Sequence, residues 1–80
     1  MAKKAFHLVF PQKLIKEPIM YLAARDNNLL LNIRRARITH EAGEATIEFE
    51  GNQADIDRAE KTMREKGVGV DPVTGDIVEG

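Results

Sequence analysis

The residues best suited to recognise a ligand lie in one segment, where an asparagine precedes a group of arginines. Asn32 stands between two apolar residues of a predicted strand, although asparagine is depleted inside strands. Arg34, Arg35 and Arg37 follow it, and a guanidinium can hold a carboxylate through forked hydrogen bonds. A second interpretation stays open: Asn32 is a polar residue on the outer face of an edge strand, and the arginines solvate that edge and discourage aggregation.

Other residue types give little support to catalysis or to a metal site. The chain has no cysteine, which excludes disulfides, thiolate nucleophiles and cysteine-ligated metal centres, and it has no serine. His7 and His40 lie in different predicted elements with no third ligand beside them. Glu48 and Glu50 share a strand face without the apolar surroundings typical of catalytic carboxylates. We therefore expect no enzymatic activity, no metal and no cofactor.

Length and composition are those of one small globular domain. The chain has 80 residues, of which 42% are hydrophobic and 31% charged, and its formal net charge of -1 provides no overall field that would attract nucleic acid. RNA-binding sheets also stack bases on aromatic residues of an open face, whereas Phe6 and Phe49 are expected on the helix side. No apolar run approaches the roughly 18 residues that span a bilayer. We expect a cytoplasmic protein that neither binds nucleic acid nor inserts into a membrane.

The spacing of apolar residues predicts four strands and two helices. A change in the phase of these residues predicts a β-bulge near Arg34 and Arg35. The segment 41–44 is expected to form a hairpin turn in which Gly43 supplies a positive φ. The apolar residues of the second strand are expected to face the core. The predicted elements are strands at 5–10, 29–39, 45–50 and 68–70, a helix that begins at Pro18 and stops at 26–28, and a helix at 53–66.

This β-α-β-β-α-β order is that of the ferredoxin-like fold, an α+β sandwich. Right-handed crossovers then give a four-stranded antiparallel sheet with both helices on one face and the first and third strands in the centre. The other face of the sheet is uncovered, and the second strand is an edge with unpaired backbone groups. Both features favour self-association or a partner strand, so we expect a homodimer.

The chain resembles the NIL domain, a small family named for an Asn-Ile-Leu signature. The resemblance rests on Leu-Leu-Asn-Ile-Arg-Arg-Ala-Arg-Ile at 30–38, the helix opening at 18–21, Gly51, and the ending at 65–70, in the order and spacing typical of the family. We assign 1–72 to the domain and 73–80 to a polar C-terminal tail. The resemblance implies an ACT-related, ferredoxin-like sandwich, in agreement with the predicted order of elements.

The family implies several contexts for such a domain. Some NIL domains form the C-terminal regulatory part of the ATP-binding subunit of bacterial methionine importers, where they dimerise, bind methionine and inhibit transport. Others precede iron–sulfur ferredoxin modules, some connected with sulfur assimilation, and some stand alone. This chain has neither an ATPase nor cluster cysteines and is similar to the stand-alone form. The resemblance implies a regulatory module for an amino acid, such as methionine or a related sulfur amino acid. The alternative is an interaction module for a ferredoxin, a sulfur-metabolism enzyme or a transporter.

The same resemblance points to Asn32, Ile33 and Arg34 as ligand-binding residues. Asn32 matches the signature asparagine, which in the family lies close to the amino-acid site. Ile33 matches as a packing residue. Arg34 replaces the signature leucine, and from its position beside Asn32 we hypothesise that it recognises a ligand carboxylate.

Overall fold

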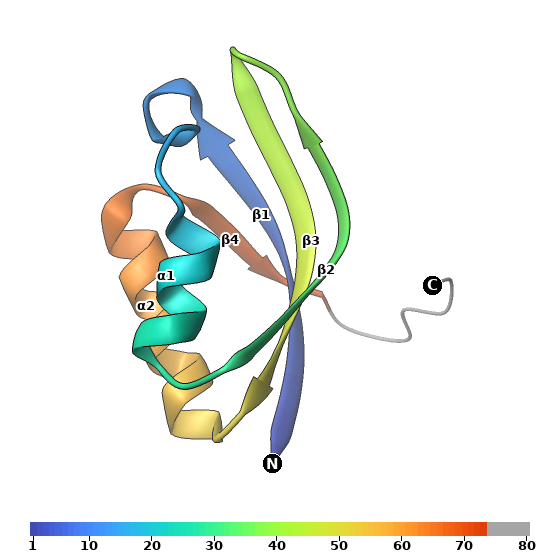
Figure 1. The fold of residues 1–80 in the computed structure, drawn as a ribbon, viewed down its shortest axis with the longest axis vertical. Coiled ribbons are helices and arrows are strands. Elements are labelled where there is room, and N and C mark those ends of the chain that lie inside the picture. Colours follow the sequence, from blue (N-terminus) through green and yellow to red (C-terminus); the bar gives the residue numbers. More distant parts are fainter. Residues whose placement is uncertain (74–80) are drawn as a thin grey trace.

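Four antiparallel strands form one sheet, and two helices cover one of its faces (Figure 1). The computed structural model describes residues 1–73. The strand order is β2-β3-β1-β4, so β1 and β3 occupy the centre as predicted. The elements are β1 (Ala2–Pro11), the short 3-10 helix η1 (Gln12–Leu14), α1 (Ile19–Asp26), β2 (Leu30–Ile38), β3 (Ala42–Gly51), α2 (Gln53–Lys66) and β4 (Gly69–Pro72). The predicted ferredoxin-like order of elements is confirmed.

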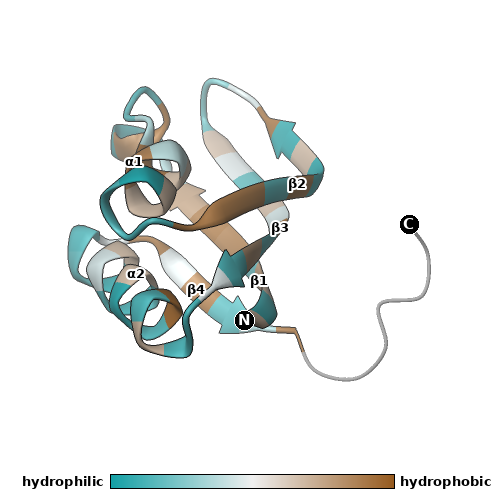
Figure 2. Ribbon diagram, turned by 60° about the horizontal axis from the view of Figure 1, so that its bottom comes forward, coloured by the Kyte–Doolittle hydropathy of each residue, from teal (hydrophilic) through white to brown (hydrophobic). Residues whose placement is uncertain are grey.

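The core lies between the sheet and the helices and takes alternate residues of the central strands. Phe6 and Leu8 of β1 and Phe49 of β3 are fully buried, and the rings of Phe6 and Phe49 meet edge to face with centroids 6.0 Å apart. Helix α2 buries Ile56 and other residues of one stripe against them, while its outer surface is hydrophilic (Figure 2). The predicted alternation of β1 and β3 is therefore confirmed, because each central strand has one face against the helices.

Helix α2 has the predicted bounds. It begins after Asn52 and ends at Gly67, whose φ of 104° is the left-handed value that glycine tolerates. Helix α1 departs slightly from its prediction, because Pro18 precedes the helix instead of lying in its first turn. The buried face of α1 consists of Ile19, Ala23 and Ala24, with Leu22 only half-buried.

The hairpin between β2 and β3 has the predicted bulge but not the predicted turn. The register shifts between Ile33 and Arg35, which confirms the bulge. Gly43 lies inside β3, opposite both Ile38 and Phe10, and does not adopt a positive φ, so the turn assigned to 41–44 was wrong. Thr39 makes the turn instead, because its hydroxyl accepts hydrogen bonds from the N–H groups of Glu41 and Ala42.

Strand β2 is far more exposed than its apolar pattern predicted. Leu31 is half-buried, but Ile33 and Ile38 are 49% and 55% exposed. The helices lie over the central strands, and the far end of β2 extends past them (Figure 1). The expectation that the apolar residues of β2 all face the core was therefore wrong, and their helix-side surface is left open.

Gly51, at the end of β3, is a position of close approach. A Cβ atom added there would lie 2.6 Å from Cδ2 of the buried Leu29. We expect Gly51→Ala to lower the free energy of unfolding by about 1–3 kcal/mol, because Leu29 must move within a packed core. Urea denaturation measures this loss. Gly69→Ala is the matched control: its added Cβ would lie an ordinary 3.5 Å from Val9, so a loss equal to that of Gly51→Ala would contradict the packing argument.

The predicted tail at 73–80 begins with a residue that still pairs with the sheet. The N–H of Val73 donates to the carbonyl of Ala5 and continues the pairing of β4 with β1. The rest of the predicted tail lies outside the described residues. Within 1–73, no helix has the length and apolar character needed to cross a membrane.

Candidate functional site

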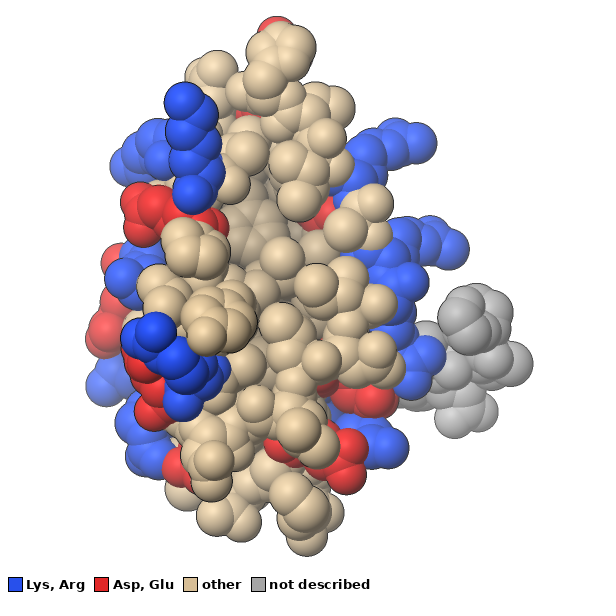
Figure 3. Space-filling model, in the orientation of Figure 1, with Lys and Arg blue, Asp and Glu red and all other residues tan. Residues whose placement is uncertain are grey.

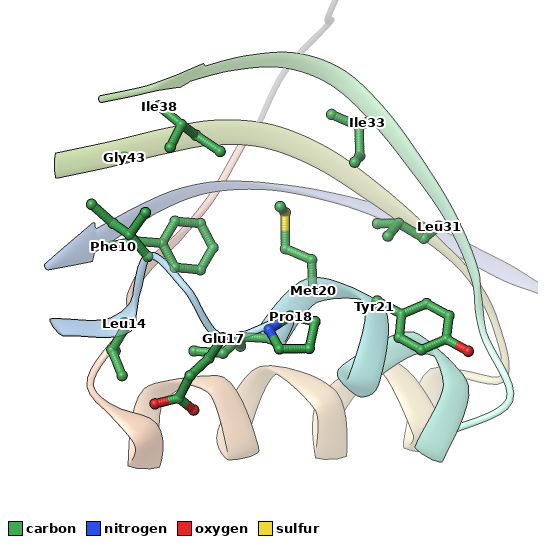
Figure 4. Close-up of a pocket in the computed structure, with 12 residues that line it drawn as sticks. Phe10, Leu14, Glu17, Pro18, Met20, Tyr21, Leu31, Ile33, Ile38 and Gly43 are labelled. Carbon is green, nitrogen blue, oxygen red and sulfur yellow. The ribbon is translucent and has the colours of Figure 1, made fainter. Parts of the chain in front are cut away.

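An apolar groove lies between the start of α1 and the edge strand β2 (Figure 4). It encloses about 160 Å³ and exists because β2 extends past the helices, as described above. Met20 points from α1 toward the strands, and Gly43 leaves space by having no side chain. The residues that line the groove are Phe10, Leu14, Ile15, Glu17, Pro18, Ile19, Met20, Tyr21, Leu31, Ile33, Ile38 and Gly43.

Charge is almost absent from this groove. Glu17 is the one charged residue that lines it, and Figure 4 shows its carboxylate turned away from the strands. Polar groups of a ligand would lack partners inside such a space, and burying them unpaired is costly. The groove is therefore suited to an apolar side chain whose polar or charged groups stay at the mouth.

Tyr21 at one end of the groove is held by its own helix. The guanidinium of Arg25 lies 5.7 Å from the centroid of the Tyr21 ring and pairs with Asp26 at 3.0 Å. The hydrogen bond and the charge of Asp26 raise the pKa of Arg25 above its usual value, with a smaller effect of Tyr21. Arg25 is thus a constant positive charge behind the ring.

The three ligand-binding residues predicted from the sequence do not share this groove. Ile33 lines it, but alternation places Asn32 on the opposite face of β2, where its register partner is Glu48. Arg34 also lies on that face, with Nη2 3.4 Å from Oε2 of Glu48, and the side chains of Arg34 and Glu48 are 27% and 15% exposed. Arg34 therefore already has a carboxylate partner within its own chain.

A second hollow lies on the uncovered face of the sheet. It holds about 450 Å³ and is lined mostly by polar residues of β1, β2 and β3, among them His7, Arg35 and Arg37. The ring of His7 lies 3.4 Å from the hydroxyl of Thr46 and 3.8 Å from Glu44. Basic side chains gather along the β2 side of the molecule (Figure 3, right). This hollow is polar where the groove is apolar.

Neither space has the residues of a metal centre. Within 1–73, no group of three or more His, Asp or Glu side chains could hold a metal ion. His7 lies in the middle of β1 and His40 in the β2–β3 turn, so the fold does not bring the two histidines together.

Comparison with known proteins identifies the chain. The sequence model of the NIL domain matches residues 4–72. The chain belongs to the NIL domain family. A crystal structure of the C-terminal domain of an ABC transporter ATP-binding protein from Enterococcus faecalis has the same fold, with a TM-score of 0.79 and 21% identity over 91% of this chain and 86% of that one. No curated protein sequence matches. Membership of the NIL family supports a regulatory module as the class of function.

Most residues of the groove in this NIL domain were missed by the sequence analysis. Met20 and Tyr21 border the apolar stripe of α1, which is typical of core-facing residues, and Glu17 lies in a connection. One signal was present: Ile33 and Ile38 lie on either side of the bulge in an edge strand, where apolar residues are at risk of exposure. The groove itself depends on how far α1 covers β2, which no local pattern encodes.

Proposed function

We propose that this NIL domain is a non-enzymatic regulatory module that binds an amino acid through an apolar side chain, with methionine or a related sulfur amino acid as the ligand. The apolar groove carries the proposal. Its volume of about 160 Å³ suits a side chain, because an apolar cavity of about 150 Å³ accommodates a benzene-sized group. A thioether adapts well to an irregular apolar space, and Met20 and Ile33 would contact it.

The charged groups of the amino acid would stay at the mouth of the groove. The exposed carboxylate of Glu17 can rotate to meet an ammonium group, and the unpaired backbone groups of the β2 edge offer further hydrogen bonds. Asn32 and Arg34 remain proposed ligand-binding residues. From the uncovered face they would act on a ligand that extends around the edge of β2, so the contribution of Arg34 is tested separately.

Titration of the labelled domain with methionine, homocysteine and cysteine, followed by heteronuclear NMR, tests the proposal. We expect saturable shifts of the amides of Met20, Tyr21 and Leu31–Ile33. Ile33→Gln should weaken binding about tenfold, because it removes an apolar contact of about 1.5 kcal/mol. Val9→Gln is the matched control, since Val9 is 45% exposed and lies on the other face of the sheet.

Two outcomes would count against this function. No shift at millimolar ligand would exclude an amino-acid sensor, and equal weakening by both glutamine variants would place binding away from the groove. Unchanged affinity in Arg34→Ala, measured in the same titration, would remove Arg34 as the partner of a ligand carboxylate. N-acetylmethionine, which lacks the ammonium charge, tests the contribution of Glu17.

A second candidate function is a protein-interaction module. The free edge of β2 favours it, because β2 pairs with β3 on one side and with no described strand on the other. The partners proposed from the family are a ferredoxin, a sulfur-metabolism enzyme or a transporter, together with a homodimer through the uncovered sheet face. A cytoplasmic location is likewise proposed from the family.

A further inference from the structure

Strand β2 presents different chemistry on its two faces. On the helix side, Leu31, Ile33 and Ile38 form the apolar wall of the groove. On the uncovered side, Arg35 lies opposite Thr46 and Arg37 lies opposite Glu44. Thr46 and Glu44 face away from the helices. A single exposed edge is therefore apolar on one side and basic on the other.

The β-bulge produces this division. Without the extra residue, strict alternation would place Arg34 on one face and Arg35 on the other. The bulge between Ile33 and Arg35 lets both arginines lie on the uncovered side, with Arg37 beyond them. Three guanidinium groups within four residues thus share one face of the edge strand.

Two of these arginines, Arg35 and Arg37, form no ion pair with the described residues. Arg34 pairs with Glu48, and the carboxylate of Glu44 lies 3.8 Å from Nε2 of His7. Among the ion pairs of residues 1–73, none involves Arg35 or Arg37. An incoming segment that carries carboxylates on this side would therefore find unpaired cations.

We propose that the edge of β2 binds an extended acidic segment of another protein, in which acidic and apolar residues alternate. The segment adds a strand to β2, so its backbone takes up the free hydrogen-bonding groups of the edge. Because side chains of a strand alternate between faces, its acidic residues meet Arg35 and Arg37 while its apolar residues enter the groove. This inference deepens the interaction function and does not depend on amino-acid binding.

Charge favours such a partner over a second copy of this chain. Antiparallel pairing of two β2 edges would bring the arginines of both copies onto the same face of the joined sheet. Like charges on neighbouring strands destabilise the pairing. An acidic segment replaces this repulsion with ion pairs, so the charges of the edge favour that segment over a second β2 edge.

Fluorescence anisotropy with three short labelled peptides tests the proposal. In the first, glutamate alternates with valine or isoleucine; the second has the same composition with the glutamates grouped; the third has lysine in place of glutamate. We expect the first to bind and the others not to bind, with NMR shifts centred on the amides of β2. Equal binding of all three peptides, or no binding of the first, would overturn the proposal.

Variants test the two faces of the edge separately. Arg35→Gln with Arg37→Gln should weaken the alternating peptide about tenfold, as expected for the loss of two exposed ion pairs. Lys61→Gln with Lys66→Gln removes the same charge from α2 and should leave binding unchanged. Equal weakening by both pairs would mean that only net charge matters and would overturn the proposal. A dimer that pairs through the edge of β2, detected by sedimentation, and that the peptide cannot displace would also overturn it.

The two proposed functions fail separately in these experiments. Binding of the alternating peptide without any effect of methionine would contradict the amino-acid ligand alone. Methionine shifts confined to the groove, with no peptide bound, would contradict the acidic partner alone.

Discussion

Replacing Phe49 by alanine is expected to lower the free energy of unfolding by about 3–5 kcal/mol, the range for a large aromatic side chain removed from a core. Phe49 is fully buried in the central strand β3 and contacts Phe6 edge to face. A domain of 80 residues has a total stability of about 4–12 kcal/mol. The loss is therefore a large share of the total stability, and the urea midpoint of the variant should fall accordingly.

Urea denaturation followed by circular dichroism measures this effect. Val9→Ala is the control, because Val9 lies in the neighbouring central strand β1 but is exposed on the uncovered face. We expect that control to lose less than about 1 kcal/mol. A loss of similar size in the two variants would mean that the helix-side layer does not dominate stability.

Asn27 is expected to give the second large effect, with a loss of about 1–3 kcal/mol in Asn27→Ala from leaving buried polar groups unpaired. It follows α1 directly and is the one buried polar residue among those described. Its amide nitrogen donates to the carbonyl of Ala23 at 2.9 Å, and its oxygen accepts from Nε of Arg58 in α2 at 3.0 Å. The side chain thus joins the two helices, and α1 forms one wall of the groove.

A double-mutant cycle with Arg58→Leu isolates the contact between the helices. The loss in the double variant should be smaller than the sum of the two single losses, because each single variant leaves one partner unpaired. Asn52→Ala serves as the control: Asn52 precedes α2 but its side chain makes no capping hydrogen bond. Additive losses at Asn27 and Arg58 would contradict a direct interaction.

The sequence predicted the layers of the fold because they follow from local rules. Alternation in β1 and β3 marks the buried face of each central strand, and the apolar stripe and the glycine at its end define α2. The phase change near Arg34 predicted the bulge, because a strand that keeps its faces can change phase only by adding a residue.

The errors occurred where distant segments meet. Gly43 has the composition of a turn, but in the fold it lies inside β3 between two neighbours, while Thr39 supplies the turn hydrogen bonds. Asn27 lies in the segment at which the helix was predicted to stop, and only the docking of α2 brings Arg58 to its oxygen. Such contacts cannot be predicted from the residues that neighbour Gly43 or Asn27 in the sequence.

The candidate site shows the same division. The sequence by itself determined the order of the elements, the central strands, the NIL family and the segment 30–38 as the distinctive part of the chain. Only the tertiary structure decided that Ile33 lies in an apolar groove instead of the core and that Arg34 pairs with Glu48. Periodicity shows which side chains share a face of a strand. How far a helix covers that strand depends on packing between segments that are far apart in the sequence. That coverage decides whether an apolar residue belongs to the core or to a binding surface.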